Sequence, residues 1–201
     1  MPGFYDTFMA LPEHFCLKAW RAQLLAQARG LTLDLGAGTG ANLCCMPEGL
    51  DLRLVEPQRG MSKHIAARLQ QSGRDAQIVQ APAEALPFED GSVDTVICTL
   101  VLCTVQDPAR AVAEIRRVLK PDGQLLFMEH VLHQGRVGAA IQRAVEPVWL
   151  LTSDGCHLTR DSLRVIEEGG FEVVELAKDA ICVSPPPLFP LVRGRATFPA
   201  G

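Results

Sequence analysis

The sequence predicts an α/β fold in which a mostly parallel β-sheet carries helices on both faces. Two observations support this prediction. Short apolar or alternating segments are separated along the chain by longer segments of helical periodicity, which is the order of parallel strands joined by helices. The last two strand-like segments, 171–176 and 192–198, have little between them to cross the sheet, so we expect an antiparallel hairpin with the C-terminal strand at one edge.

Alternation, β-branched residues and apolar runs predict seven strands. In chain order they are expected over 31–35, 51–56, 76–81, 93–101, 124–130, 171–176 and 192–198. The fourth is apolar along most of its length, as expected of a parallel strand that is buried on both faces. The sequence therefore favours a Rossmann-like, doubly wound seven-stranded sheet.

Helical periodicity and capping residues predict the helices between these strands. They are expected over 13–28, 58–71, 108–119, 136–151 and 160–170, with one further short helix ending before Pro47. Asp107 is expected to cap the third of these helices, with Pro108 at its first position, and Thr159 is expected to cap the last. Pro147 should disturb the fourth helix.

Length and composition fit one globular domain over residues 1–201. The chain has 201 residues, of which 48% are hydrophobic and 21% charged, so it has enough apolar material for a substantial core. The formal net charge is −4 and the sequence pI is about 5.7. Neither value suggests a protein that binds nucleic acid.

The seven cysteines are expected to be mostly small, buried apolar residues in a reducing compartment. Their number is odd and no Cys-x-x-Cys pair occurs, so we expect neither a disulfide framework nor a zinc site. The first residues lack the basic region and apolar run of a signal peptide. No segment approaches the ~20 apolar residues of a membrane-spanning helix, so we expect a cytoplasmic protein.

The stretch "LTLDLGAGTGAN" at 31–42 is the most informative local motif. Asp34 lies near the end of the first strand and is followed by Gly36, Gly38 and Gly40. Glycines this close together leave the backbone open to a ligand in front of a helix N-terminus. With Ala41, the glycines fit the pattern of a dinucleotide site; with Asp34, they fit that of a nucleoside–amino acid such as S-adenosylmethionine. The loop alone leaves both ligands, and a purely structural turn, open.

An acidic residue follows at the spacing that both ligand classes use. Glu56 lies at the end of the second strand, ~20 residues beyond the loop, where a carboxylate can bind the two ribose hydroxyls. Pro57 behind it would offer a flat apolar face to an adenine ring. The alternative is a solvated charge at the end of a strand.

Motifs in the rest of the chain resemble the class I S-adenosylmethionine-dependent methyltransferases. The segments that carry the resemblance are "LDLGAGTG" (33–40), "LVEP" (54–57), "APAEALPFEDGSVDTVIC" (81–98), "AVAEIRRVLKPDGQLLF" (111–127) and "LTRDSLRVIEEGGFEVVEL" (158–176). They cover nearly the whole chain, in the order and spacing of that family. The resemblance implies a cofactor-binding core over 31–130, a lid or helix over 1–30, and substrate-side helices with the last strands over 131–201.

One branch of that class resembles the chain more closely. The segments "CTLVLC" (98–103), "FMEHV" (127–131) and "DGCHLTR" (154–160) are similar to those of the mammalian alkyl thiol methyltransferases of the methyltransferase-like seven group. Those mammalian proteins carry an apolar N-terminal membrane anchor, whereas this sequence begins without one, so we do not expect a transmembrane segment. The apolar segment 1–12 is expected to be a lid, a patch in peripheral contact with a membrane, or a disordered tail.

The resemblance implies S-adenosylmethionine as cofactor and S-adenosylhomocysteine as its product. We expect no metal, because a thiol nucleophile is already acidic and the sequence shows no cluster of metal ligands. The residues that it implies around the cofactor are Tyr5, Asp34, Gly36, Ala37, Gly38, Gly40, Asn42, Glu56, Pro57, Met61, Ala83, Glu84, Thr99 and Leu100. In the adenine loop this chain has Pro82-Ala83, where the wider class often has Asp-Ala. Contacts to adenine in this loop are therefore expected to come mostly from the backbone.

The implied reaction is the S-methylation of a small apolar thiol or of sulfide, in a pocket that includes Cys103, Trp149 and Leu150. A free thiol has a pKa near ~8.5, so a few per cent is thiolate at neutral pH and a general base is not obligatory. His130, Asp154 and His157 are the candidate bases. His130 has the better position, because the carboxyl ends of parallel strands face the ligand crevice.

Three other functions stay open at this point. The general motifs fit a methyltransferase of quinones or lipids equally well. A nicotinamide-dependent dehydrogenase fits the glycine loop but not the later motifs. A protein that binds S-adenosylmethionine without catalysis fits a chain with an intact cofactor loop and no certain base. The sequence predicts no oligomeric state.

Overall fold

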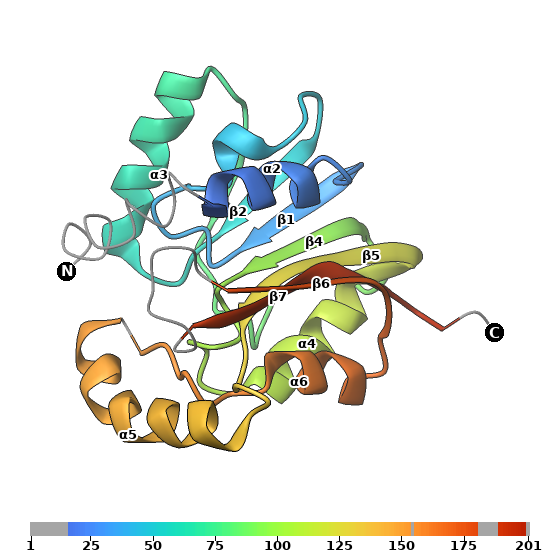
Figure 1. Cartoon of the computed structure of the whole chain (residues 1–201). Coiled ribbons are helices and arrows are strands. Elements are labelled where there is room, and N and C mark those ends of the chain that lie inside the picture. The colour runs from blue at the N-terminus through green and yellow to red at the C-terminus, as the bar shows by residue number, and fades with distance from the viewer. Residues whose placement is uncertain (1–15, 154, 181–188, 200–201) are drawn as a thin grey trace.

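A computed structural model describes residues 16–153, 155–180 and 189–199 of the chain. Asp154 and the whole apolar segment 1–12, which includes Tyr5 and was predicted to be a lid, therefore lie outside the described residues. Within the described part, seven strands form one sheet in the order β3-β2-β1-β4-β5-β7-β6, with helices on both faces (Figure 1). The predicted fold class, a Rossmann-like and mostly parallel seven-stranded sheet, is confirmed.

The strands are β1 (Leu31–Leu35), β2 (Asp51–Val55), β3 (Gln77–Val79), β4 (Val93–Thr99), β5 (Leu119–His130), β6 (Glu172–Ala180) and β7 (Pro190–Thr197). The first five strands are parallel to one another. From β1 the chain runs outward to β2 and β3, then returns to place β4 on the other side of β1. Strand order reverses between β1 and β4, and such a reversal opens a crevice at the carboxyl ends of the strands.

The two C-terminal strands pair antiparallel to each other, as predicted. β7 also pairs antiparallel with β5, so it lies between β5 and β6. The C-terminal strand is therefore not the outermost one, and β6 forms the edge. Gly194 of β7 allows this close packing, because a Cβ atom there would lie 2.0 Å from the carbonyl oxygen of Glu175.

The helices are α2 (Lys18–Leu25), η2 (Leu43–Cys45), α3 (Arg59–Ser72), α4 (Pro108–Val118), α5 (Arg136–Thr152) and α6 (Ser162–Glu168). α2, η2 and α3 share one apolar core with one face of the sheet, while α4 and α6 share another core with the opposite face (Figure 1). On β5, Leu125 and Phe127 belong to the second of these cores, and Leu126 and Met128 belong to the first. This alternation buries the central strands on both faces.

Two helix boundaries differ from the sequence predictions. The first helix ends at Leu25 rather than at residue 28. The last helix is capped by Asp161, whose carboxylate accepts a hydrogen bond from the backbone N–H of Arg164, and not by Thr159. The reason is a contact with another element, because the backbone N–H of Thr159 donates to Glu146 of α5 (3.1 Å) and holds Thr159 in the loop before α6. The predicted cap of α4 is confirmed, since Asp107 accepts from the backbone N–H of Arg110.

Of the cysteines in the described residues, some are buried and some are exposed, and most form no disulfide. Cys98, Cys103 and Cys156 are buried and free, whereas Cys44 is exposed. Cys16 is disulfide-bonded, a single bond that the expectation of no disulfide framework did not include. The count and spacing of cysteines give no signal for a single bond of this kind. Among the described helices, none has the length and apolar character needed to cross a membrane.

Candidate functional site

A cavity of about 830 Å³ lies at the carboxyl ends of β1, β2 and β4, where the strand order reverses. Its wall is built mainly from the loops that follow the first four strands. It includes most of the residues that the sequence analysis assigned to a cofactor, namely Gly36, Ala37, Gly38, Asn42, Glu56, Pro57, Met61, Ala83, Glu84, Thr99 and Leu100. Asp34 and Gly40 are not part of the wall.

The three glycines of the loop have different roles, although each has a positive φ angle. A Cβ atom on Gly36 would lie 2.8 Å from a methyl group of Val101, and one on Gly40 would lie 3.1 Å from Leu43. These two positions lack a side chain because the protein packs against them. A Cβ atom on Gly38 would come no closer than 3.7 Å to a described atom, the carbonyl oxygen of Gly36. Gly38 therefore leaves backbone open on the wall of the cavity.

Glu56 presents a fixed carboxylate to the cavity and is not a solvated strand-end charge. Only 5% of its surface is exposed. One carboxylate oxygen accepts a hydrogen bond from the backbone N–H of Gly38 and the other from that of Gln58, both at 2.9 Å. These bonds join the end of β2 to the glycine loop. They leave lone pairs on both oxygens for a ligand with paired hydroxyl groups.

The carboxylate of Glu84 binds the backbone just before α4. One of its oxygens accepts hydrogen bonds from the backbone N–H groups of Gln106 (2.9 Å) and Asp107 (3.2 Å). Its carbonyl oxygen accepts from the side chain of Arg110. Glu84 thus ties the loop after β3 to the start of α4, and shapes the wall of the cavity from both sides.

A buried polar network lies beneath the glycine loop. The amide nitrogen of Asn42 donates to a carboxylate oxygen of Asp34 (2.7 Å) and to the hydroxyl of Thr99 (2.9 Å). The guanidinium of Arg21 donates to the amide oxygen of Asn42 (2.6 Å) and to the hydroxyl of Thr99 (3.0 Å). These residues come from β1, the loop after it, the end of β4 and α2, so the network joins four segments at the cavity.

One oxygen of this network has no partner in the described part of the chain. Asp34 is fully buried, and its second carboxylate oxygen accepts no hydrogen bond there. Burial raises the pKa of Asp34 to about 7, while the hydrogen bond from Asn42 and the charge of Arg21 act in the opposite direction. An unsatisfied buried acceptor is costly, and an additional hydrogen-bond donor would satisfy it.

Arg21 is a residue of the site that the sequence analysis missed. It lies on α2, lines the cavity, and is only 6% exposed. The sequence did contain a signal for this residue, because position 21 falls on the same helical stripe as Leu17, Leu24 and Ala28, all of which are buried. A cation on the apolar stripe of an amphipathic helix indicates a buried anion or a ligand.

Glu129, at the end of β5, is the second missed residue. It is fully buried, and its carboxylate accepts hydrogen bonds from the backbone N–H groups of Val101 (2.8 Å), Leu102 (3.0 Å) and Cys103 (3.3 Å). Burial raises its pKa to about 7. The carboxylate fixes the turn after β4, in which Leu100 has a φ of 60°, an uncommon conformation for a residue other than glycine.

His130, a predicted base, is not part of the described wall of the cavity. Its side chain is 5% exposed, and its ring lies 5.9 Å from that of Phe189. Burial lowers the pKa of His130 to about 4, although a hydrogen bond to the carbonyl oxygen of Pro190 opposes this change. The imidazole is therefore neutral at physiological pH and a weak proton acceptor.

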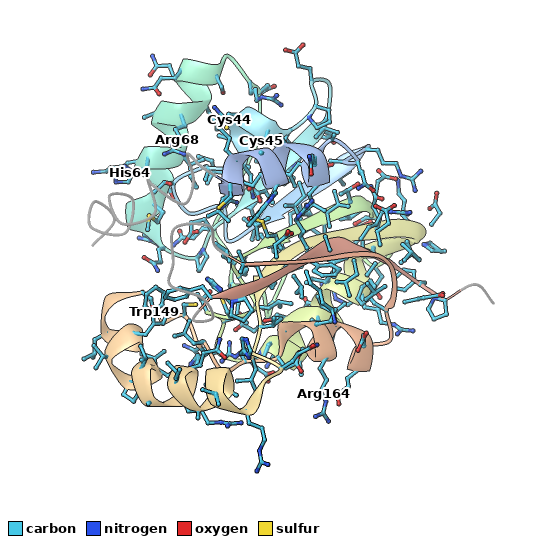
Figure 2. The ribbon with its side chains drawn as sticks, in the orientation of Figure 1. Cys44, Cys45, His64, Arg68, Trp149 and Arg164 are labelled. Carbon is cyan, nitrogen blue, oxygen red and sulfur yellow. The ribbon has the colours of Figure 1, made fainter. Side chains whose placement is uncertain are left out.

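The predicted substrate residues are also set back from the described wall of the cavity. Cys103 is fully buried, with its sulfur 3.4 Å from that of Cys156. Trp149 is half-buried on α5 and packs against Phe189 with ring centroids 4.7 Å apart (Figure 2). Leu150 is half-buried beside it. Ser153, at the end of α5, is the residue from this part of the chain that reaches the wall.

The described residues contain no group of three or more His, Cys, Asp or Glu side chains arranged to hold a metal ion. His157 pairs with Glu146 instead (3.0 Å) and does not line the cavity. The prediction that no metal is required stays a prediction.

Known proteins with similar sequences are methyltransferases. A family model described as a methyltransferase domain matches residues 33–127. The thiol S-methyltransferase TMT1B of Rattus norvegicus is 38% identical over 168 residues, which cover 82% of this chain and 69% of the relative. The protein of the same name from Homo sapiens is 33% identical over 192 residues, covering 90% of this chain and 79% of the relative.

Solved structures share the fold at lower identity. The YcgJ protein of Bacillus subtilis superimposes with a TM-score of 0.73 at 17% identity, covering 94% of this chain and 100% of that one. The [4+2]-cyclase SpnF superimposes with a TM-score of 0.72 at 18% identity, covering 92% and 81%. Because a cyclase shares it, the fold alone does not specify the reaction.

The buried Asp34 should make the free energy of unfolding depend on pH. Its folded pKa of about 7 lies above its ordinary value of 3.8, so the folded protein binds more protons between these values. The stability contributed by Asp34 is complete below pH ~4 and is lost as the pH rises through about 7. Without ligand, the wild type should therefore lose stability relative to Asp34→Asn as the pH rises, by at most about 1.4 kcal/mol per pH unit.

Urea denaturation of both proteins from pH 4.5 to 7.5 measures this difference. His130 and Glu129 also titrate in or near this range, but both are present in the two proteins, so the comparison isolates Asp34. A difference in stability that stays constant across the range would contradict the raised pKa.

Proposed function

Because the chain belongs to the S-adenosylmethionine-dependent methyltransferases, in the family that contains the thiol S-methyltransferases, we propose that it transfers the methyl group of S-adenosylmethionine to small apolar thiols or to sulfide. The observation that carries this proposal is the similarity to thiol S-methyltransferases over 82–90% of the chain. The aligned length is enough to include both the cofactor loops and the segments on the substrate side.

The cavity has the features that this cofactor requires. Glu56 supplies a carboxylate for the two ribose hydroxyls, and Gly38 leaves the backbone open for close approach of the ligand. The unsatisfied oxygen of Asp34 is an acceptor for an ammonium group, and Arg21 is a cation for a carboxylate. Together these residues fit the amino acid end and the ribose of S-adenosylmethionine.

When bound, the cofactor supplies a methyl group on a positively charged sulfur, which a nucleophile takes by in-line displacement. The part of the protein is to hold the nucleophile in line and to exclude water. Glu129 serves this purpose by fixing the turn 100–103, because Leu100 and Val101 of that turn line the cavity. A thiolate and a sulfonium neutralise each other in the reaction, so a poorly hydrated cavity favours it.

We propose that the substrate thiol loses its proton to solvent rather than to a base of the enzyme. No histidine belongs to the described wall of the cavity, and the two glutamates on that wall accept backbone hydrogen bonds. His130, with a pKa of about 4, is a poor proton acceptor. Asp154 lies outside the described residues and stays a candidate, so it belongs in the kinetic test below.

Two alternatives share the same cofactor cavity. A quinone or lipid methyltransferase would use the same loops after β1 and β2, with a different nucleophile. A protein that binds the cofactor without methyl transfer would also keep them, and the fold is shared with a cyclase. The family match sets aside the nicotinamide-dependent dehydrogenase.

Calorimetry should show that binding of S-adenosylmethionine depends on the cavity residues. Gly38→Arg should abolish binding, because the new side chain would fill space beside the open backbone. Glu56→Ala should weaken it by about 1.5–3 kcal/mol, the contribution of hydrogen bonds to a charged group. Gly49→Arg is the matched control, since Gly49 also has a positive φ and is outside the described wall of the cavity.

Unchanged affinity in Gly38→Arg, or equal losses in Gly38→Arg and Gly49→Arg, would show that the cofactor does not bind at this loop. Both arginine variants should first be checked for folding by circular dichroism, because a positive φ strains any residue except glycine.

The pH dependence of kcat/KM tests how the thiol ionises. If the substrate ionises by itself, kcat/KM should rise with pH and level off near the pKa of the thiol used. A more acidic alkyl thiol should then shift the midpoint down by the difference between the two thiol pKa values. His130→Asn should cost far less than the ~10²–10⁴-fold expected for a lost general base.

A midpoint that ignores the substrate, together with a loss of that size in His130→Asn, would instead identify His130 as the base. The same fixed midpoint with an equivalent loss in Asp154→Asn would assign the role to Asp154.

A further inference from the structure

Two adjacent cysteines on η2 are not used by the proposed reaction. Cys44 is exposed and Cys45 is partly exposed, and neither forms a disulfide bond. Their sulfur atoms lie 3.5 Å apart. Successive residues of a 3₁₀-helix point about 120° away from each other, so this short distance is not a general property of neighbouring residues.

Surrounding contacts define the positions of both sulfur atoms. The thiol of Cys44 donates to the carbonyl oxygen of Ala41 (3.5 Å), and that of Cys45 donates to the carbonyl oxygen of Lys18 (3.8 Å). η2 contacts both α2 and α3, and Figure 2 shows the two cysteines in the region where these elements meet. The pair is therefore held on a supported short helix and not on a free loop.

The backbone geometry disfavours a disulfide between these two residues. Adjacent Cα atoms are about 3.8 Å apart across a trans peptide bond. Unstrained disulfides join Cα atoms that are about 4.4–6.8 Å apart. Oxidation would strain the backbone, so the pair is expected to stay a dithiol. A ligand atom that bridges the two sulfur atoms avoids this strain.

We propose that Cys44 and Cys45 form a chelating site for monosubstituted trivalent arsenicals. An organic arsenic(III) oxide, R–As=O, would react with both thiols. Two S–As bonds form, the As=O bond is lost, and the oxygen leaves as water with the two thiol protons. No atom changes oxidation state, so no oxidant or reductant is needed. Because the sulfur atoms are already adjacent, little conformational entropy is lost on binding, and preorganisation of this kind favours affinity.

The chain contains a second thiol pair that serves as an internal control. The sulfur atoms of Cys103 and Cys156 are 3.4 Å apart, nearly the same separation. Their exposed fractions are only 0% and 6%. If sulfur separation alone determined binding, both pairs would react; if access is also required, only Cys44 and Cys45 will react with the folded protein.

The test treats the purified, folded full chain with phenylarsine oxide in the presence of excess glutathione, a monothiol that competes at single cysteines. Intact-protein mass spectrometry should show one adduct per chain in the wild type. The same adduct should form in the double variant Cys103→Ser/Cys156→Ser. It should be lost in Cys44→Ser and in Cys45→Ser, and a small dithiol should remove it from the wild type.

Three results would overturn the proposal: no adduct in the wild type, an adduct that persists in both Cys44→Ser and Cys45→Ser, or an adduct that disappears from the Cys103→Ser/Cys156→Ser variant. Circular dichroism of each variant confirms that the folded protein is compared. Because the readout is the mass of the adduct, the result does not depend on methyl transfer.

Discussion

The hydrogen bond between Asn42 and the buried carboxylate of Asp34 is the interaction on which the cavity depends. It joins the end of β1 to the loop that follows it, and Asn42 extends the connection to Thr99 of β4 and Arg21 of α2. Burying a carboxylate is costly unless it is hydrogen-bonded, and this network satisfies only one of its oxygens. The other oxygen accepts no hydrogen bond from the described residues. Under the proposed function, it is an acceptor for the ammonium group of the cofactor.

Glu129 has a corresponding role on the opposite side of the strand reversal. Its buried carboxylate accepts backbone N–H groups of the turn after β4, as Glu56 does for the glycine loop and Glu84 for the start of α4. Three acidic side chains therefore fix the backbone of the loops around one cavity. Because each fixes backbone rather than moving a proton, these contacts explain a preformed site and leave methyl transfer to positioning and desolvation.

Much of this organisation could be predicted from the sequence, since parallel strands, glycine turns and an acid at the end of β2 leave local signals. Side chains that act across the fold were harder to predict. Arg21 was interpreted only as part of a helix. Glu129 was overlooked beside His130, because the strand register decides which side chain at the end of β5 faces the turn after β4. Thr159 was taken for a cap because the contact of its backbone with Glu146 is not local in sequence. The disulfide of Cys16 left no spacing signal.

The central claim is that this cavity directs the methyl group of S-adenosylmethionine to a thiol. The most direct measurement is a competition assay, in which the enzyme and methyl-labelled S-adenosylmethionine are given sulfide, an alkyl thiol, a quinol and a phospholipid together, and the labelled products are separated. The account predicts that the label appears in methanethiol or the alkyl methyl sulfide, and that Gly38→Arg abolishes it. Label in the quinol or phospholipid product, with the thiol and sulfide unmethylated, would contradict the account.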